Sequence, residues 1–178
     1  MKTNVLFYNT VTPLLKEALN VLMAEPLFAP FRLVGGTNLS LRLGHRLSVD
    51  IDMFTDAPYN SLDYKTFEKF LQAKFNYYYS GDPTSIIGFG RGYHIGNSKD
   101  DCIKLDLMYT DPFIHQADII DGIRMASMDD IVAMKINAIS RGGRKKYYWD
   151  IYNLFQRYSL KDMLDLHLKR HPWEPKVQ

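Results

Sequence analysis

Two stretches of the chain alternate between apolar and polar residues, a pattern typical of β-strands that bury one face. The first runs from Leu47 to Phe54 and the second from Cys102 to Tyr109. The expected inward positions are Val49, Ile51, Met53, Ile103, Leu105, Leu107 and Tyr109. The polar faces hold Asp50 and Asp52 in the first strand and Asp106 in the second. If the two strands are neighbours, these three carboxylates lie close together.

Apolar residues at helical spacing predict helices on both sides of these strands. Thr10 or Thr12 can cap the first helix, and Gly44 can end the second. Ser127 and Asp130 resemble a capping box at the start of a later helix. The predicted helices are 10–24, 37–44, 61–75, 127–140, 145–158 and 160–170.

Shorter strands complete the predicted architecture. They are expected over 31–34, 75–79, 85–89 and 93–95, whereas 111–125 is less regular. We therefore predict an α/β (α+β) fold: a small mixed sheet with flanking helices and a C-terminal helical portion. The expected division is an α/β core over residues 1–115 and a helical portion over 116–178 that packs on it.

Composition limits the class of protein. The 178 residues are 46% hydrophobic, enough for a single domain with a sizeable core, and the net charge of +2 indicates neither a nucleic-acid nor a membrane partner. The one cysteine, Cys102, excludes an internal disulfide framework and favours a reducing compartment. Residues 1–13 are too polar for a signal peptide, and no apolar run approaches the ~20 residues that cross a bilayer. We expect a cytoplasmic protein.

A glycine pair, Gly35-Gly36, lies between the strand that ends at Val34 and the helix expected from Thr37. Glycine lets backbone amides approach an anion, and a helix N-terminus favours phosphate. By itself the pair is an ordinary turn, and Asp50-Ile51-Asp52 is an ordinary polar strand face. Clustered carboxylates, however, repel one another unless a cation such as Mg²⁺ lies between them. The two features together indicate a site for nucleotide phosphates and a divalent metal.

The same stretches resemble a known family. They are Gly-Gly-Thr at 35–37, Gly-His-Arg-x-Ser-x-Asp-Ile-Asp-x-Phe at 44–54 and Lys-Leu-Asp-Leu at 104–107. Together they resemble the AbiEii/AbiGii toxin nucleotidyltransferases of the DNA polymerase β-like nucleotidyltransferase superfamily, over roughly residues 32–155. The resemblance implies a nucleotidyltransferase-type sheet.

The resemblance also implies roles for the motif residues. Gly35, Gly36 and Thr37 would hold the nucleoside triphosphate. Asp50, Asp52 and Asp106 would bind Mg²⁺, with two ions expected, and Asp106 would help to activate the acceptor. His45, Arg46 and Ser48 belong to the same family stretch, and His45 either contacts phosphate or braces the loop.

Two charged residues fall inside the apolar stripes of the predicted C-terminal helices. They are Lys135 and Asp150. A charge on a core-facing stripe needs a partner or a task, and a Lys135–Asp150 ion pair or a lysine that reaches out to solvent would supply one. The resemblance instead implies that both face the nucleotide site in catalytic roles. Tyr147 departs from the family pattern, because many members have an aspartate there.

Four further signals have simpler explanations. Gly88–Gly92 lacks the helix and distant acid of a dinucleotide site and fits a twisted hairpin or bulge. His167 and His171 share a helix face without a third ligand, so a solvated turn is expected rather than a metal site. Tyr77–Tyr79 fits strand propensity, although stacking on a base is the alternative. The basic cluster at 141–146 is either a solvated loop or a contact to RNA or nucleotide phosphate.

These features favour Mg²⁺-dependent transfer of NMP from ATP, GTP, CTP or UTP to an acceptor hydroxyl. From the resemblance, we expect the toxin of a bacterial toxin–antitoxin or phage-defence system, with a cognate antitoxin as partner and tRNA as acceptor. A small-molecule nucleotidyltransferase of the antibiotic-modifying kind has the same core residues. A catalytically silent nucleotide-binding module is the third interpretation, and the intact carboxylate set argues against it.

Overall fold

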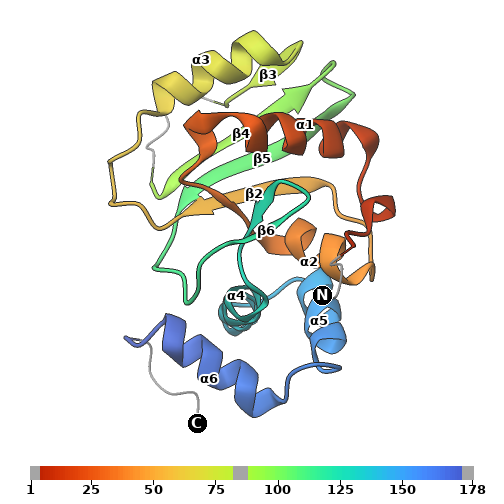
Figure 1. Cartoon of the computed structure of the whole chain (residues 1–178), viewed down its shortest axis with the longest axis vertical. Helices are drawn as coiled ribbons and strands as arrows, with labels where there is room; N and C mark the ends of the chain where they lie inside the picture. The colour runs from red at the N-terminus through yellow and green to blue at the C-terminus, as the bar shows by residue number, and fades with distance from the viewer. Residues whose placement is uncertain (1–4, 82–87, 174–178) are drawn as a thin grey trace.

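The computed structural model describes residues 5–81 and 88–173, which form a mixed sheet with helices (Figure 1). The strands are β1 (Arg32–Leu33), β2 (Asp50–Thr55), β3 (Tyr77–Tyr79), β4 (Gly90–Gly96), β5 (Cys102–Tyr109), β6 (Asp118–Ile120) and β7 (Ile123–Met125). The helices are α1 (Pro13–Ala24), α2 (Gly35–Leu43), α3 (Tyr64–Lys74), α4 (Met128–Ser140), α5 (Lys145–Leu154) and α6 (Leu160–Arg170), with short 3-10 turns at Tyr8–Thr10 and Pro26–Phe28.

The strand order is β3-β4-β5-β2-β1-β7-β6. The pairs β2–β5 and β1–β7 are parallel, and the other neighbouring pairs are antiparallel. The predicted mixed α/β fold is therefore confirmed. The two alternating strands, β2 and β5, lie side by side at the centre of the sheet.

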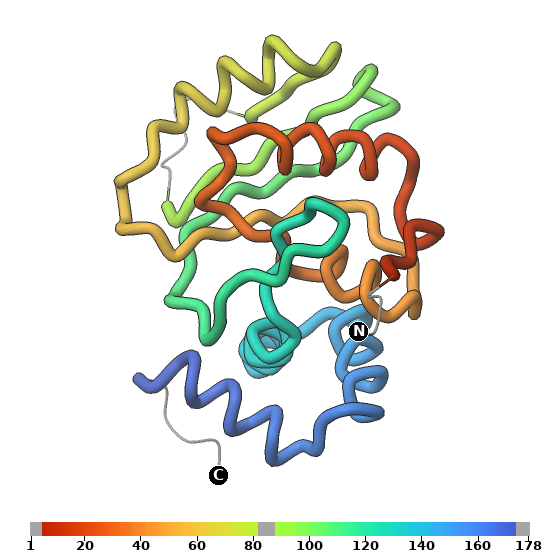
Figure 2. Tube along the Cα trace, in the orientation of Figure 1, coloured from red at the N-terminus to blue at the C-terminus, as the bar shows by residue number. Residues whose placement is uncertain are grey.

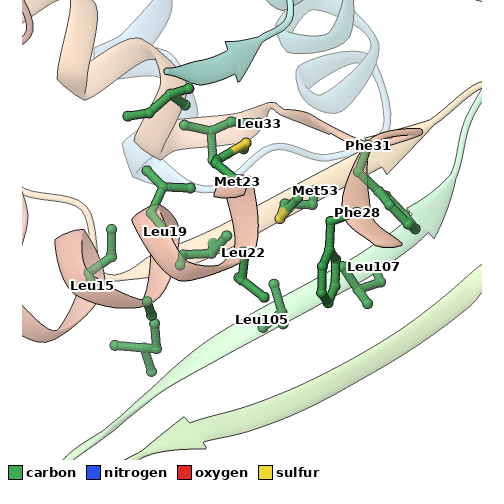
Figure 3. Packing of buried hydrophobic residues seen from close by; sticks show 14 of the residues in the cluster. Leu15, Leu19, Leu22, Met23, Phe28, Phe31, Leu33, Met53, Leu105 and Leu107 are labelled. Atoms are coloured by element: carbon green, nitrogen blue, oxygen red, sulfur yellow. The ribbon is translucent and has the colours of Figure 1, made fainter. Parts of the chain in front are cut away.

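The main core lies between the sheet and helices α1 and α3. Figure 3 shows Leu15, Leu19 and Leu22 of α1 against β2 and β5. The inward positions predicted for β5 and for most of β2 are buried there. Val49 is the exception: it is 60% exposed, because β2 begins only at Asp50. The preceding Ser48 donates its backbone N–H to the carbonyl of Thr10, so this segment is bonded to the 3-10 turn Tyr8–Thr10 instead of the sheet.

A second apolar cluster joins α2, α4, α5 and α6. Its buried members are Val34, Leu39, Ala126, Ile131, Val132, Ile136, Ile151, Leu154 and Met163. Phe54 packs against it from the face of β2 opposite to Ile51 and Met53. The C-terminal helices are therefore anchored on the side of the sheet that also holds the aspartates.

Several predicted element ends need correction. Thr12, not Thr10, caps α1 through a hydrogen bond from the Leu15 N–H. Helix α2 begins at Gly35 instead of Thr37, and Gly44 ends it in a left-handed conformation as predicted. Helix α3 begins after Asp63, whose side chain caps it, and α5 ends four residues before 158. Strand β4 is longer than 93–95, and the strand expected over 85–89 falls mostly outside the described residues.

The segment 111–125, expected to be less regular, contains the hairpin β6–β7. Its two-residue loop is Asp121-Gly122, with φ of 50° and 78°, the conformation of a type I′ turn. Because Leu33 of β1 pairs with Met125 of β7, the sheet continues beyond residue 115. The division into portions 1–115 and 116–178 stays a prediction.

Ser127 caps α4, but the expected capping box is only half formed. The Ser127 side chain accepts the N–H of Asp130 at 3.1 Å. The Asp130 carboxylate instead accepts the N–H of Ile114 at 2.7 Å, which ties the loop after β5 to α4. Among the helices of the described part of the chain, none combines the length and apolar character needed to cross a membrane.

Candidate functional site

The three aspartates of the alternating strands lie on one face of the sheet. In the parallel pair β2–β5, Asp52 is directly opposite Asp106, and Asp50 is opposite Lys104. Neighbouring strands lie roughly 4.8 Å apart, so the carboxylates form one acidic group. The condition stated from the sequence, that the two strands are neighbours, is thus met.

A pocket of about 420 Å³ lies over this acidic face. Gly35, Gly36, Arg46 and Ser48 line it on one side, and Lys135 lines it from α4. Basic residues of the 141–146 segment complete the wall. An acidic floor with basic walls suits a triphosphate bound together with a cation.

The electrostatics of the floor centre on Asp52. Its pKa is raised to about 6, because it is buried and because Asp106 and Asp50 are close, against the opposing charges of Lys135 and Lys104. Within the described ranges, Asp106 Oδ1 is buried and has no hydrogen-bond partner. On the floor of the pocket, the Asp52 carboxyl therefore resists ionisation, and Asp106 Oδ1 has no hydrogen-bond donor among the described residues.

These observations fit a divalent cation. The donors are carboxylate oxygens, which Mg²⁺ prefers, and a cation would relieve the repulsion that raises the Asp52 pKa. Lysines partly compensate the charge: Lys104 Nζ lies 2.5 Å from Asp106 Oδ2, and Lys146 Nζ lies 3.7 Å from Asp50 Oδ2. Among residues 5–81 and 88–173, no three acidic, histidine or cysteine side chains already converge as a ligand set. Binding would therefore require these side chains to move away from the lysines.

Helix α2 starts directly beside the acidic floor. Gly35 has φ of 69°, and a Cβ on it would lie only 2.0 Å from Asp52 Oδ2. A Cβ on Gly36 would lie 2.5 Å from the Arg46 Nη2 atom. At Gly35 the positive φ and the close carboxylate both call for glycine, and this approach brings the N–H groups of the first helical turn next to the pocket.

Thr37 and Ser48 brace this junction. Thr37 is fully buried, its hydroxyl lies 2.8 Å from Ser48 Oγ, and it also donates to the backbone carbonyl of Asp50. Thr37 therefore ties α2 to the start of β2 from behind, whereas Ser48 and the two glycines line the pocket.

His45, Arg46, Lys135 and Asp150 form a buried ionic network. Asp150 is fully buried in α5, and Lys135 Nζ lies 2.7 Å from its Oδ2. Arg46 Nε and His45 Nε2 each lie 2.7 Å from Oδ1. Burial raises the Asp150 pKa, but these hydrogen bonds and the Lys135 charge outweigh it and hold the pKa well below its usual range.

The network places its members differently toward the pocket. Lys135 and Arg46 line the pocket, whereas Asp150 and His45 lie behind them. The Lys135–Asp150 ion pair considered from the sequence is therefore present, and Lys135 also lines the pocket. Tyr147 lies over this region, with its ring 5.0 Å from Lys135 Nζ.

Sequence reasoning missed the end of the pocket formed by α6 and the loop after β5. Arg170 donates to the carbonyls of Asp111 and Pro112 and to the Thr110 hydroxyl at 2.7–3.1 Å. The expectation of a solvated turn around His167 and His171 is wrong, because these residues are only 2% and 3% exposed. No local pattern showed this, since an arginine and histidines in a last helical turn are common on exposed helices.

Gly92 was also missed. In the antiparallel pair β4–β5 it faces Asp106, and a Cβ on it would lie 2.8 Å from Asp106 Oδ1. The absence of a side chain leaves room beside this carboxylate. The glycine-rich segment 88–92 thus contributes to the site through strand β4. This contribution depends on the register between β4 and β5, which a local motif does not reveal.

The fold and this site define the class of protein, a nucleotidyltransferase, and comparison with known proteins gives the family. The model of the family described as "Nucleotidyl transferase AbiEii toxin, Type IV TA system" matches residues 17–176, nearly the whole chain. The chain belongs to this AbiEii family. The resemblance noted from residues 35–37, 44–54 and 104–107 is thereby confirmed.

Two further proteins are similar. The uncharacterized protein aq_aa25 of Aquifex aeolicus (strain VF5) is 29% identical over 167 residues, which cover 88% of this chain and 73% of that protein. The crystal structure of JHP933 from Helicobacter pylori superposes with a TM-score of 0.58 at 23% identity, over 88% of this chain and 72% of JHP933. The second likeness concerns the fold alone.

Proposed function

We propose that this nucleotidyltransferase uses Mg²⁺ to move NMP from an NTP to an acceptor hydroxyl, with release of pyrophosphate. One observation above all supports this: Asp52 and Asp106 are paired across β2 and β5, directly beside the glycine start of α2. Carboxylates that can hold a metal, next to a helix N-terminus that favours phosphate, are the parts that metal-assisted phosphoryl transfer uses.

The chain's own residues then divide the work. The first-turn N–H groups of α2, with Arg46 and Lys135, bind and orient the triphosphate. Asp50, Asp52 and Asp106 would hold Mg²⁺, which when bound offsets charge on the α-phosphate and lowers the pKa of the acceptor hydroxyl. Asp106, whose Oδ1 has no donor among the described residues, would orient that hydroxyl.

The proposed biological setting rests on the family description, and the proposed acceptor rests on the charge of the pocket wall. A toxin of a type IV toxin–antitoxin system implies an antitoxin partner. We propose tRNA as the acceptor, because basic residues of the 141–146 segment line the pocket wall.

The test incubates the full chain with Mg²⁺, each α-³²P-labelled NTP in turn, and either total tRNA, a set of small hydroxyl compounds or no acceptor. Labelled tRNA supports the proposal, and labelled small product favours an antibiotic-type transferase instead. The variant tested is Asp50→Ala. Its control is Asp100→Ala, which changes an exposed acid in the turn between β4 and β5. Absence of transfer with every NTP and acceptor, while the Asp50→Ala variant binds nucleotide as wild type does, contradicts the proposal.

A further inference from the structure

Three aromatic side chains of α5 point away from the core. Tyr148, Trp149 and Tyr152 are 55%, 54% and 66% exposed. The rings of Trp149 and Tyr152 are stacked, with centroids 5.9 Å apart and planes inclined by 28°. Aromatic rings of this size are normally buried in a core or an interface, so an exposed stacked pair suggests a surface that takes up a ligand.

Basic side chains border these rings. Lys145, Lys146 and Arg46 line a hollow together with the three aromatics. Arg46 and Lys146 also line the carboxylate pocket, and Lys146 Nζ lies 3.7 Å from Asp50 Oδ2. The hollow and the pocket therefore adjoin each other, with these two cations at their boundary.

We infer that this α5 aromatic surface (Tyr148, Trp149 and Tyr152 with Lys145 and Lys146) binds an unpaired segment of a polynucleotide. Bases stack on the rings of Trp149 and Tyr152, and the lysines contact the phosphates on either side. This combination of flat π faces with a cationic border is the chemistry that binds single strands without sequence preference. The inference rests on the proposed function in one respect: the bound strand is the acceptor, and its end enters the pocket past Lys146.

The same chemistry selects against other occupants. In a duplex the bases are already stacked on one another, so a paired segment offers the rings no free base face. A protein partner or a second copy of the chain would cover the aromatics, but neither requires lysines that lead toward the acidic floor. Charge complementarity and the shared border with the pocket thus favour a single strand.

The test measures binding of a fluorescein-labelled 12-nucleotide RNA of mixed sequence by anisotropy, against a hairpin of the same composition. EDTA is present and NTP is omitted, so that no transfer occurs. The variants are Trp149→Ala, Tyr152→Ala and the conservative Trp149→Phe. The matched control is Tyr79→Ala: Tyr79 is also 54% exposed, but it lies on β3, at the far end of the molecule from α5 (Figure 1).

We expect each alanine variant to bind the single strand about tenfold more weakly, because each loses one base–aromatic stack. Trp149→Phe should stay within about threefold of wild type, Tyr79→Ala should match it, and the hairpin should bind more weakly than the open strand. Equal loss in Tyr79→Ala, or equal affinity for hairpin and open strand, overturns the inference. A second outcome also overturns it: the alanine variants bind RNA as wild type does, but their molar mass falls from dimer to monomer. The surface would then bind a second copy of the chain.

Circular dichroism melts verify that the variants fold, and if Trp149→Ala fails to fold, Tyr152→Ala and Trp149→Phe decide the outcome. Failure here is distinct from failure of the proposed function. Loss of NMP transfer to every acceptor, with single-strand binding intact, contradicts only the proposed function. Transfer to tRNA with an unchanged KM for tRNA in Trp149→Ala contradicts only this inference, which predicts a raised KM for the polynucleotide and an unchanged KM for the NTP.

Discussion

The carboxylate of Asp150 binds the guanidinium of Arg46 at two points, with Nε–Oδ1 at 2.7 Å and Nη2–Oδ2 at 2.9 Å. The partners are 104 residues apart, and Figure 2 shows α5 beside the chain that follows α2. The contact holds Arg46 Nη2 against Gly36, whose added Cβ would lie 2.5 Å away. These contacts favour a positioning role for Asp150: it fixes a pocket arginine without itself lining the pocket.

Asp150→Asn should therefore weaken the fold strongly. The amide leaves the positive charges of Arg46 and Lys135 without their buried counter-charge, and breaking such a buried pair costs about 3–5 kcal/mol of unfolding free energy. Urea denaturation at pH 7.5 measures it. The control is Asp165→Asn, which removes the exposed pair with Lys161 and should leave the unfolding free energy nearly unchanged. Equal effects of the two substitutions would mean that the buried network contributes little.

This network also shows how far sequence reasoning reached. The apolar stripes placed Lys135 and Asp150 toward the interior, because burial of a helix face is encoded in local spacing. The strand Cys102–Tyr109 and the helix Leu160–Arg170 were predicted with the ends that the structure shows. The partners of Asp150 in the segment after α2, His45 and Arg46, follow from tertiary packing, which no local pattern encodes.

Two other differences have distinct causes. The hairpin β6–β7 did have a signal, since Asp121-Gly122 is a dipeptide typical of type I′ turns, but its strands are only three residues long and show little alternation. The opposition of Gly92 and Asp106 depends on the β4–β5 register. A shift of that register by one residue would place a side chain over the carboxylate.

The pH dependence of stability should reveal the raised pKa of Asp52. The folded pKa of about 6 lies above the usual 3.8, so the folded state binds the proton more tightly than the unfolded state between these values. In EDTA, the contribution of this group is fully present below pH 3.8 and is lost as pH rises through about 6. A shift of about two units corresponds to at most about 3 kcal/mol. Asp52→Asn should remove this decline and be more stable than wild type at pH 7.5, as urea denaturation at pH 4, 5, 6 and 7.5 can measure.

The control for this experiment is Asp162, whose pKa is shifted in the opposite direction. The pKa of Asp162 is lowered by hydrogen bonds from Ser159, so its contribution is lost as pH falls. Asp162→Asn should therefore leave the decline toward pH 6 in place. A wild-type profile that is flat between pH 4 and 6 would contradict the raised pKa of Asp52, which comes from its burial and from the nearby Asp106 and Asp50.

Mg²⁺ should stabilise the protein and compete with Lys104. A ligand that binds only the folded state at 100 times its Kd adds about 2.7 kcal/mol to the unfolding free energy. Asp106→Asn should lose this gain, whereas Asp100→Asn in the exposed turn should keep it.

Lys104→Ala removes the ammonium 2.5 Å from Asp106 Oδ2 and should tighten Mg²⁺ binding by up to about fivefold, as measured by calorimetry. Stabilisation of the same size in Asp106→Asn would place the ion elsewhere.

Gly35→Ala should separate backbone strain from steric conflict at the start of α2. The substitution forces a side chain into φ of 69° and puts its Cβ 2.0 Å from Asp52 Oδ2, so both the helix start and the carboxylate must shift. Gly122→Ala is the matched control, because Gly122 has φ of 78° and its Cβ would meet nothing within 4 Å among the described residues. The control should cost only the strain of a left-handed residue, about 1–2 kcal/mol of unfolding free energy, with unchanged NMP transfer.

Gly35→Ala should cost more than that and reduce transfer at least about tenfold, since misplacement of a reacting group by about 1 Å can cost a hundredfold in rate. Thermal melts and the labelled-NTP assay on both variants provide the comparison, and equal effects of the two substitutions would show that the close approach of α2 to Asp52 is not required for transfer.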